Sequence, residues 1–303
     1  MSFSVTVLGS GSAVPTSRRG LTSQYILCRG RHILIDCGEG TQMRIRKYGV
    51  KFQRIEHILI SHLHGDHYFG LVGLLSTMHL MGRKKQIQIH GPKGLKEIVE
   101  LQLNYEGARL AFEVSFNVLD PKIAGTVFED EKISIQHFPL VHRIPTTGFV
   151  IREKLTERHL KAELAQQDGV KIAYYHRLKK GEDVIDEDGK LISFDKYTRA
   201  PDSPRAYAFC SDTKYSETIL PSIEGVDLLY HEATFVEQHL DRAKATMHTT
   251  ATQAAAIAKK ASVGKLLMGH LSARYDSVDQ HIEEAEKVFE NSEVAEDGET
   301  YLL

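Results

Sequence analysis

The sequence predicts an α/β fold in which two mixed β-sheets pack face to face and carry helices on their outer sides. Short apolar strands alternate with helical segments up to about residue 152 and again from about residue 206. Two such halves, each rich in strands and each with helices, favour a layered sandwich. The chain has 303 residues, of which 42% are hydrophobic and 26% are charged, so it is long enough to bury a large core.

The first half contains most of the predicted strands, which are short apolar runs bounded by turn residues. They are Ser4–Leu8, Gln24–Cys28, His32–Ile35, His57–Ser61, Gln86–His90, Phe112–Leu119, Lys132–Phe138 and Gly148–Arg152. Three segments have helical spacing instead, namely Thr41–Tyr48, Leu71–Met81 and Lys93–Tyr105. Arg29-Gly30-Arg31 is predicted to close a hairpin between the second and third strands.

Residues from about 153 to 205 differ in character from the rest. Thr156–Gln167 is predicted to be a helix with Thr156 as its N-cap, and a polar stretch with several Gly-containing turns follows it. We therefore expect one domain over residues 1–303 with an excursion at about 153–205, and no second domain.

The alternation of strands and helices resumes after this insertion. The predicted strands are Tyr207–Cys210, Asp227–Tyr230 and Lys265–Met268, and the predicted helices are Thr249–Ala261 and Ser277–Phe289.

The charge is nearly balanced overall but unevenly distributed. The net charge of −2 argues against a uniformly basic nucleic-acid binder. Residues 1–54 nevertheless hold nine Lys or Arg and two acids, whereas residues 276–303 hold ten acids and one Lys. One end could therefore face phosphates, or both could be solvated surfaces without a partner.

The expected location is the cytoplasm. The first residues lack a secretory signal, and no run approaches the roughly 18 apolar residues that span a bilayer. Three widely spaced cysteines, Cys28, Cys37 and Cys210, form no disulfide framework and are expected to be reduced.

The run His62-Leu63-His64-Gly65-Asp66-His67 follows an apolar strand directly. A loop at a strand end lets imidazole and carboxylate side chains converge, and these groups bind zinc, iron and manganese. One ion cannot easily take all four ligands from so short a loop, so the run favours two ions. A solvated histidine-rich loop is the alternative.

Three further candidate ligands also come directly after predicted strands. His142 follows QHFPLV, Asp212 follows AYAFCS, and His270 follows KLLMG. A catalytic metal site needs such ligands from separate parts of the chain, together with an open position for water.

This pattern resembles the metallo-β-lactamase-fold hydrolases. The resemblance implies a four-layer αβ/βα sandwich with two zinc ions per subunit; Mn²⁺ and Fe²⁺ are the alternatives. It also implies a ligand set of His62, His64 and His142 for one ion, Asp66, His67 and His270 for the other, and Asp212 bridging both.

Further motifs resemble the short-form ribonuclease Z (tRNase Z) family of tRNA 3′-processing endoribonucleases, in order along essentially the whole chain. They are LGSGSAVP at residues 8–15, DCGEGTQ at 36–42, SHLHGDHYFGL at 61–71, HEATF at 231–235, MHTT at 247–250 and GHLSARY at 269–275. The resemblance implies that precursor tRNA is the substrate, that the enzyme is a homodimer, and that no membrane is involved.

In that family the insertion is a protruding flexible arm, an exosite that binds tRNA. Arg177, Lys179 and Lys180 resemble its basic segment, and a plain solvated loop is the alternative. The usual Gly-Pro pair of the arm is missing here. The family's PxKxRN loop, which lies near the tRNA 3′ end, is incomplete at residues 15–20, which keep Pro15 and Arg19 but lack the Lys. The resemblance implies that Arg19 binds the substrate, and the handling of a CCA terminus is left open.

The resemblance also implies the catalytic roles. Asp66 would orient the attacking water, while His248, paired with Glu232, would protonate the leaving 3′-oxygen. Arg274 would bind a phosphate, with a structural ion pair as the alternative. The expected products are a tRNA with a 3′-hydroxyl and a trailer with a 5′-phosphate.

Two other functions would use the same residues. Another hydrolase of this fold, acting on a small phosphodiester, thioester, lactone or arylsulfate, would need the same ligands. A non-catalytic RNA-binding or metal-storage protein could also retain the fold, although the ligands and the proton donor argue against it.

Overall fold

The structure is a computed structural model that describes residues 3–104 and 109–303. The chain divides into two compact units. We call Met1–Arg152 together with Arg205–Leu303 the core unit, and Glu153–Pro204 the inserted unit.

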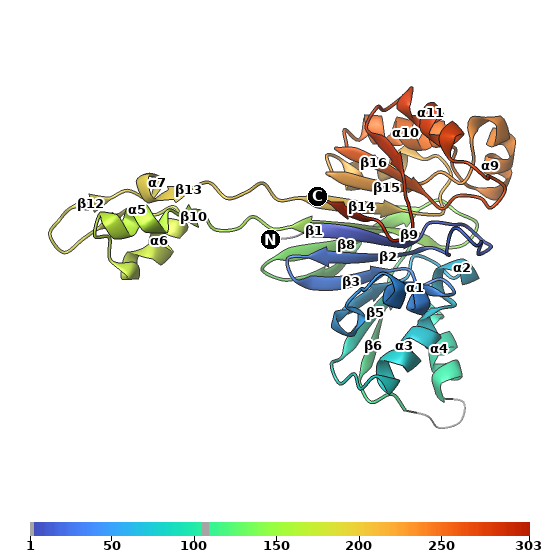
Figure 1. Cartoon of the computed structure of the whole chain (residues 1–303), viewed down its shortest axis with the longest axis horizontal. Coiled ribbons are helices and arrows are strands. Elements are labelled where there is room, and N and C mark those ends of the chain that lie inside the picture. Colours follow the sequence, from blue (N-terminus) through green and yellow to red (C-terminus); the bar gives the residue numbers. More distant parts are fainter. Residues whose placement is uncertain (1–2, 105–108) are drawn as a thin grey trace. The chain divides into compact units, whose positions relative to one another are not determined.

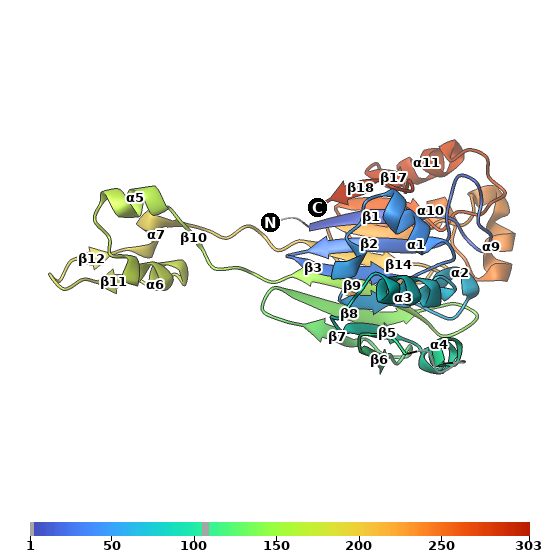
Figure 2. The same ribbon diagram turned by 60° about the horizontal axis from the view of Figure 1, so that its bottom comes forward.

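The first sheet of the core unit has seven strands in the order β18-β1-β2-β3-β4-β5-β6. They are β1 (Phe3–Gly9), β2 (Ser23–Cys28), β3 (Arg31–Ile35), β4 (His57–Leu59), β5 (Ile87–Gly91), β6 (Val114–Val118) and β18 (Thr300–Leu302). β1, β2 and β3 pair antiparallel and lie side by side in Figure 2, whereas β3 to β6 pair in parallel. The sheet is therefore mixed.

The second sheet also has seven strands, in the order β17-β16-β15-β14-β9-β8-β7. They are β7 (Gly125–Glu129), β8 (Ile133–Leu140), β9 (Thr146–Glu153), β14 (Ala206–Cys210), β15 (Leu228–Glu232), β16 (Lys265–Gly269) and β17 (Ser292–Val294). β14 to β17 pair in parallel, so the carboxyl ends of these strands lie along one edge.

Helices cover the outer face of each sheet (Figure 1). Those of the first half are α1 (Thr41–Lys47), η1 (Phe52–Arg54), α2 (Gly65–Tyr68), α3 (Leu71–Leu80) and α4 (Leu95–Asn104). Those of the second half are η3 (Glu217–Ile219), α8 (Leu220–Ile223), η4 (Glu237–His239), α9 (Leu240–Thr246), α10 (Ala251–Lys260) and α11 (Asp279–Glu286).

Three clusters of buried apolar side chains correspond to these layers. One joins inward-facing residues of both sheets, such as Val5, Ile33, Phe209 and Tyr230. A second lies between the first sheet and its helices, and the third lies between the second sheet and its helices. The predicted four-layer sandwich of two mixed sheets is thus confirmed, because each sheet buries both faces.

The inserted unit has a small core of its own, formed by Ala165, Val170, Leu178, Val184, Ile192 and Tyr197. Its elements are β10 (His159–Leu160), α5 (Ala162–Gln167), η2 (Ile172–Tyr174), α6 (Tyr175–Lys179), β11 (Val184–Ile185), β12 (Leu191–Ile192), α7 (Phe194–Tyr197) and β13 (Thr198–Arg199). The stretch therefore has more internal structure than its polar composition suggested.

The predicted helix Thr156–Gln167 is wrong in its first half. His159 and Leu160 pair as a strand with Thr198 and Arg199, so the helix begins at Ala162 with Lys161 at its N-cap. A pairing partner nearly 40 residues away overrides the local helical preference here.

Other predicted boundaries shift by one to three residues, as at α10, which begins after Thr250. The side chain of Thr250 accepts a hydrogen bond from the Gln253 backbone, and the Gln253 side chain bonds back to Thr250 in a capping box. Tyr105, the predicted last residue of α4, lies outside the described residues. No helix within the described ranges is long and apolar enough to span a bilayer.

Candidate active site

The seven predicted metal ligands come together at the carboxyl ends of strands from both sheets. The histidine run follows β4, and His142, Asp212 and His270 follow β8, β14 and β16, respectively. Asp212 and His270 have left-handed backbones, with φ values of 62° and 54°. Non-glycine residues adopt this conformation at a cost, and such strain concentrates at functional sites.

Asp212 connects two groups of ligands. Its Oδ2 atom lies 3.5 Å from Nε2 of His62 and 3.6 Å from Nε2 of His142. Its Oδ1 atom lies 3.1 Å from Nε2 of both His67 and His270. The two carboxylate oxygens thus face different histidine pairs, which is the arrangement that a ligand shared by two cations requires.

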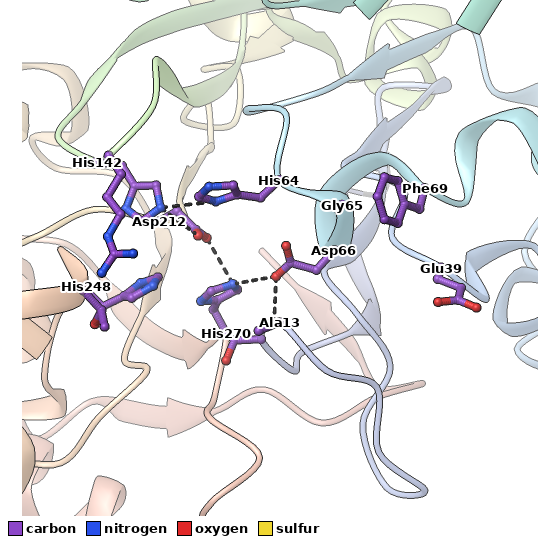
Figure 3. A pocket seen from close by; sticks show the side chains of 13 residues that line it. Ala13, Glu39, His64, Gly65, Asp66, Phe69, His142, Asp212, His248 and His270 are labelled. Atoms are coloured by element: carbon purple, nitrogen blue, oxygen red, sulfur yellow. Dashed lines mark hydrogen bonds and ion pairs between the residues drawn. The ribbon is translucent and has the colours of Figure 1, made fainter. Parts of the chain in front are cut away.

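Each group is completed by a further residue of the histidine run (Figure 3). His64 Nδ1 lies 3.1 Å from His62 Nε2 and 3.4 Å from His142 Nε2. Asp66 Oδ2 lies 3.5 Å from His270 Nε2 and 3.6 Å from His67 Nε2. The structure thus brings these residues together in the two groups that the family resemblance implies.

Outer hydrogen bonds determine which ring nitrogen of His62, His67 and His142 faces the cluster. Asp36 Oδ2 accepts a hydrogen bond from His67 Nδ1 at 2.6 Å and another from the Ser61 hydroxyl at 2.8 Å. Because that hydroxyl donates to Asp36, its oxygen accepts from His62 Nδ1 at 3.0 Å. His142 Nδ1 donates to the Met247 carbonyl at 3.1 Å. Because Nδ1 of each of these three rings is hydrogen-bonded on the outer side, Nε2 is the nitrogen that faces the cluster.

Glu232 organises the other side of the site. It is fully buried, and its Oε1 accepts hydrogen bonds from His248 Nδ1 at 2.8 Å and from the Thr213 backbone at 2.6 Å. Its Oε2 accepts a hydrogen bond from the Thr234 hydroxyl at 2.6 Å. The hydroxyl oxygen of Thr234 in turn accepts a hydrogen bond from His270 Nδ1 at 3.0 Å. One carboxylate thus orients both His248 and the ligand His270.

The same carboxylate sets the charge of His248. Burial alone would lower the pKa of His248, but the adjacent Glu232 carboxylate raises that pKa to about 9. Burial would raise the pKa of Glu232, yet His248 holds it below its ordinary value. His248 is therefore suited to carry a proton at neutral pH.

The donor set fits divalent cations. Four buried or nearly buried carboxylates, Asp36, Asp66, Asp212 and Glu232, lie among the histidines, and none of them forms a salt bridge with a Lys or Arg of the described residues. Nε2 of His67 and Nε2 of His270 are buried without a hydrogen-bond partner among those residues. Burial would lower the pKa of His67, but Asp212, Asp36 and Asp66 hold it well above its ordinary value. Buried charges of this kind are normally paired or bind metal.

A cavity of about 480 Å³ opens onto the two clusters. Three residues that line it were not singled out from the sequence, namely Arg143, Phe69 and Glu39. The Arg143 guanidinium donates to the Ala245 carbonyl at 2.9 Å. The position of Arg143 directly after His142 was an available signal. Glu39 and Phe69 lie within the DCGEGTQ and SHLHGDHYFGL motifs, although neither residue was assigned a role from the sequence.

Comparison with known proteins identifies the family. The chain is 45% identical over 296 residues to ribonuclease Z of Bacteroides fragilis, covering 98% of this chain and 97% of that protein. The chain belongs to the ribonuclease Z family. The crystal structure of human tRNase Z, short form, superposes with a TM-score of 0.72 at 28% identity, covering 98% of both chains.

Two other matches concern the fold that the ribonuclease Z family shares with other proteins. The metallo-beta-lactamase fold protein YhfI of Bacillus subtilis has a TM-score of 0.70 at 18% identity, covering 100% of both chains. A family model described as anti-Pycsar protein Apyc1 matches residues 3–166, and that part of the chain belongs to its family as well. That match includes His142 but ends before Asp212.

The remaining predicted site residues lie in varied surroundings. Arg274, within the last ribonuclease Z motif, is exposed; its guanidinium lies 5.2 Å from the ring centre of Phe235, a ring that contacts His248. Arg19 is engaged inside the protein, where it donates to Ser10 and the Ala295 carbonyl and pairs with Glu296.

The basic residues of the inserted unit differ in how far their charge is already neutralised. Arg177 pairs with Glu182 at 3.1 Å, and Lys179 pairs with Glu157 at 2.7 Å. Lys180 is exposed and forms no ion pair with a described residue. Of the three predicted tRNA contacts in this unit, Lys180 is therefore the most available.

Proposed function

We propose that this protein is a zinc-dependent endoribonuclease that removes the 3′ trailer from precursor tRNA. The observation that carries the proposal is the combination of two ligand clusters sharing Asp212 with a Glu232–His248 pair on the same cavity. The ribonuclease Z names of relatives at 45% and 44% identity support the RNA substrate. A tRNA substrate also agrees with the cytoplasmic location predicted from the sequence.

The proposed metal ligands are those already described. His62, His64 and His142 would hold one ion, Asp66, His67 and His270 the other, and Asp212 would bind both. Five imidazoles and two carboxylates suit zinc, and Mn²⁺ and Fe²⁺ accept the same ligands. Such ions supply Lewis-acid activation of water and compensate the charge of the phosphoryl oxygens.

The protein's own groups would then divide the reaction between two sides of the cavity. Asp66, whose Oδ2 is fixed by a 2.8 Å hydrogen bond from the Ala13 backbone, would orient the attacking water. His248 would donate its proton to the leaving 3′-oxygen, while Glu232 stabilises the charged imidazole. Proton delivery to that oxygen leaves a 3′-hydroxyl on the tRNA and a 5′-phosphate on the trailer.

Outside the cavity, the proposal assigns phosphate binding to Arg274 and to Arg177, Lys179 and Lys180 of the inserted unit. Arg19 was predicted to share this role, but its contacts with Ser10, Ala295 and Glu296 favour a structural role.

The decisive experiment incubates the purified protein with a 3′-extended precursor tRNA, with and without a chelator. We expect one cut at the end of the tRNA body, a 3′-hydroxyl product, and loss of cleavage on chelation that Zn²⁺ restores. A product with a 3′-phosphate, or cleavage that survives complete metal removal, would contradict the mechanism.

A small phosphodiester is the second candidate substrate, because a hydrolase of this fold acting on it would use the same seven ligands. Turnover of bis(p-nitrophenyl) phosphate, measured beside precursor tRNA, separates the two candidates. The proposed function requires a far higher kcat/KM for the tRNA.

We also propose that the protein is a homodimer. Three exposed apolar side chains, Met43 on α1 and Leu80 and Met81 at the end of α3, lie on helices that contact each other. Exposed apolar groups of this kind are typical of interaction surfaces. Light scattering at micromolar concentration tests this proposal, and a monomer would refute it.

A further inference from the structure

The cavity beside the metal ligands has two chemically different flanks. On one side lie His248 and Arg143, a proton donor and a cation. On the other lie Phe69 and Glu39, and Figure 3 shows them on the side of Asp66 that faces away from His248. The proposed reaction assigns no role to this second flank.

Phe69 is held in place at the ligand loop but remains open to solvent. Its side chain follows α2 and is 64% exposed. A Cβ atom on Gly65 would lie 2.2 Å from Phe69 Cε2, so the ring packs directly against the backbone between His64 and Asp66. Tyr68 contacts it edge-on, with ring centres 5.0 Å apart. The ring is therefore fixed in position while much of its surface faces the solvent.

An exposed phenylalanine gives up the stabilisation that burial would provide. Proteins that bind single-stranded RNA use such rings to stack bases, because every base offers an aromatic face. A trailer leaving a tRNA end is single-stranded, so its bases are free to stack on a fixed ring.

The carboxylate of Glu39 disfavours phosphate binding on this flank. Its side chain is exposed and forms no hydrogen bond or ion pair with the described residues. A carboxylate repels phosphate but accepts hydrogen bonds from a base amino group or a ribose 2′-hydroxyl. The pair therefore suits the base and sugar of a nucleotide, with the backbone passing over the metal ligands.

The direction of the chain follows from the position of the proton donor. If His248 protonates the leaving 3′-oxygen, the last tRNA nucleotide lies on the His248 side. The first trailer nucleotide then extends to the opposite side, past Asp66. We propose that Phe69 and Glu39 form the subsite for the first trailer nucleotide, in which its base stacks on Phe69 and one of its hydrogen-bond donors binds Glu39. This inference rests on the proposed function.

The stacking contact is tested by a double-mutant cycle in which residue 69 of the protein and the first trailer nucleotide of the substrate are each changed, alone and together. Wild type, Phe69→Ala and Phe69→Trp are assayed on precursor tRNA whose first trailer nucleotide is either normal or an abasic ribose. We expect base removal to lower the wild-type kcat/KM about tenfold, the loss of one stacked base. Phe69→Ala should show the same loss on the normal substrate and little further loss on the abasic one, while Phe69→Trp should resemble wild type.

The matched control is Leu101→Ala, because Leu101 is an equally exposed apolar residue on α4 that does not line the cavity. The stacking contact would be overturned if Leu101→Ala lowered kcat/KM as much as Phe69→Ala does. It would also be overturned if the effects of Phe69→Ala and of base removal on kcat/KM were independent, so that the combined loss equalled their product. If wild type cleaves no precursor, the proposed function fails and the subsite with it. If wild type cleaves normal and abasic precursors equally well, the subsite alone fails.

Glu39→Ala identifies the donor that Glu39 binds. We expect it to lower kcat/KM several-fold on a precursor with cytidine at the first trailer position. The effect should disappear with 2′-deoxycytidine if the sugar hydroxyl is the donor, or with uridine if the base amino group is. An unchanged effect on both substrates, or faster cleavage by the variant, would exclude Glu39 from the subsite.

Discussion

The Nδ1 atom of His248 lies 2.8 Å from Oε1 of Glu232, a carboxylate that has no access to solvent. Glu232 also accepts hydrogen bonds from the backbones of Thr213 and Thr249, at 2.6 and 3.1 Å. The charge of His248 holds the pKa of Glu232 below its ordinary value, and the Glu232 carboxylate in turn raises the pKa of His248. The proposed role of His248 as a proton donor would therefore depend on a residue that cannot reach the substrate.

Replacing Glu232 by Gln should therefore shift the alkaline limb of the pH profile of kcat to lower pH. In the wild type the donor is lost as pH rises through the His248 pKa of about 9. Without the carboxylate that pKa should fall toward about 6.5, so activity should decline from neutral pH upward. At pH 8 we expect kcat to fall roughly 30-fold, because a group with a pKa of about 6.5 is only about 3% protonated at that pH.

His248→Ala and Thr234→Val serve as controls for this prediction. His248→Ala should remove the alkaline limb that belongs to this group. Thr234→Val breaks the link from Glu232 to His270 but leaves the Glu232–His248 bond, so it should retain the wild-type limb. An unshifted profile in Glu232→Gln would mean that His248 is not the donor.

Asp212→Ala should lose metal from both clusters, whereas His142→Ala should affect one. The reason is that Asp212 Oδ1 and Oδ2 face different histidine pairs, while His142 contacts a single group. Elemental analysis after dialysis measures the metal content of each variant. Equal losses in the two variants would argue against Asp212 as the shared ligand.

Removing the metal should also destabilise the folded protein. Ligands that bind only the native state stabilise it by about 4 kcal/mol at a thousand times their Kd, which corresponds to roughly 10 °C in Tm for a chain of this size. Calorimetry before and after chelation checks this expectation. An unchanged Tm would show that the buried carboxylates need no cation.

The fold and most of the site were predictable because local patterns determine them. Apolar strands such as His57–Ser61 are recognisable from composition, and a polar residue directly after a buried strand must lie at the sheet edge. The positions of Asp212 and His270 beside the histidine run could therefore be predicted from the strands that precede them. The pairing of Glu232 with His248 followed from family resemblance, whereas the sequence did not identify Ser61 and His67 as the hydrogen-bond partners of Asp36.

Features that depend on distant contacts could not be predicted. The strand at His159 exists because Thr198 pairs with it, and no local signal marks either residue. Charge counts suggested a basic first segment facing phosphates, yet Arg44 pairs with Asp297 at the other end of the sequence, where burial raises the pKa of Asp297. The exposed ring of Phe69 became notable only when the cavity beside it was defined.

Asp36→Asn should weaken metal binding without disturbing the fold. Asp36 has a left-handed backbone with φ of 55°, which Asn tolerates. The amide can present one acceptor oxygen, whereas the carboxylate accepts from Ser61 and His67 at once. We expect a 10- to 100-fold loss of metal affinity, typical of an outer-shell partner, with activity restored by excess Zn²⁺. Failure of excess metal to restore activity would indicate a direct role in catalysis.

The final prediction concerns the inserted unit and the salt dependence of tRNA binding. Binding through phosphates releases counterions, so log Kd should vary linearly with log salt. Because Lys180 forms no ion pair within the part of the chain that the structure describes, Lys180→Ala should reduce the magnitude of that slope by about 0.7 to 0.9. Arg177→Ala and Lys179→Ala should change the slope less, because Glu182 and Glu157 already offset those charges.

Filter binding of precursor tRNA between low and high salt measures the slopes. A flat wild-type slope would exclude phosphate-dominated binding, and equal slopes in wild type and Lys180→Ala would remove Lys180 from the interface.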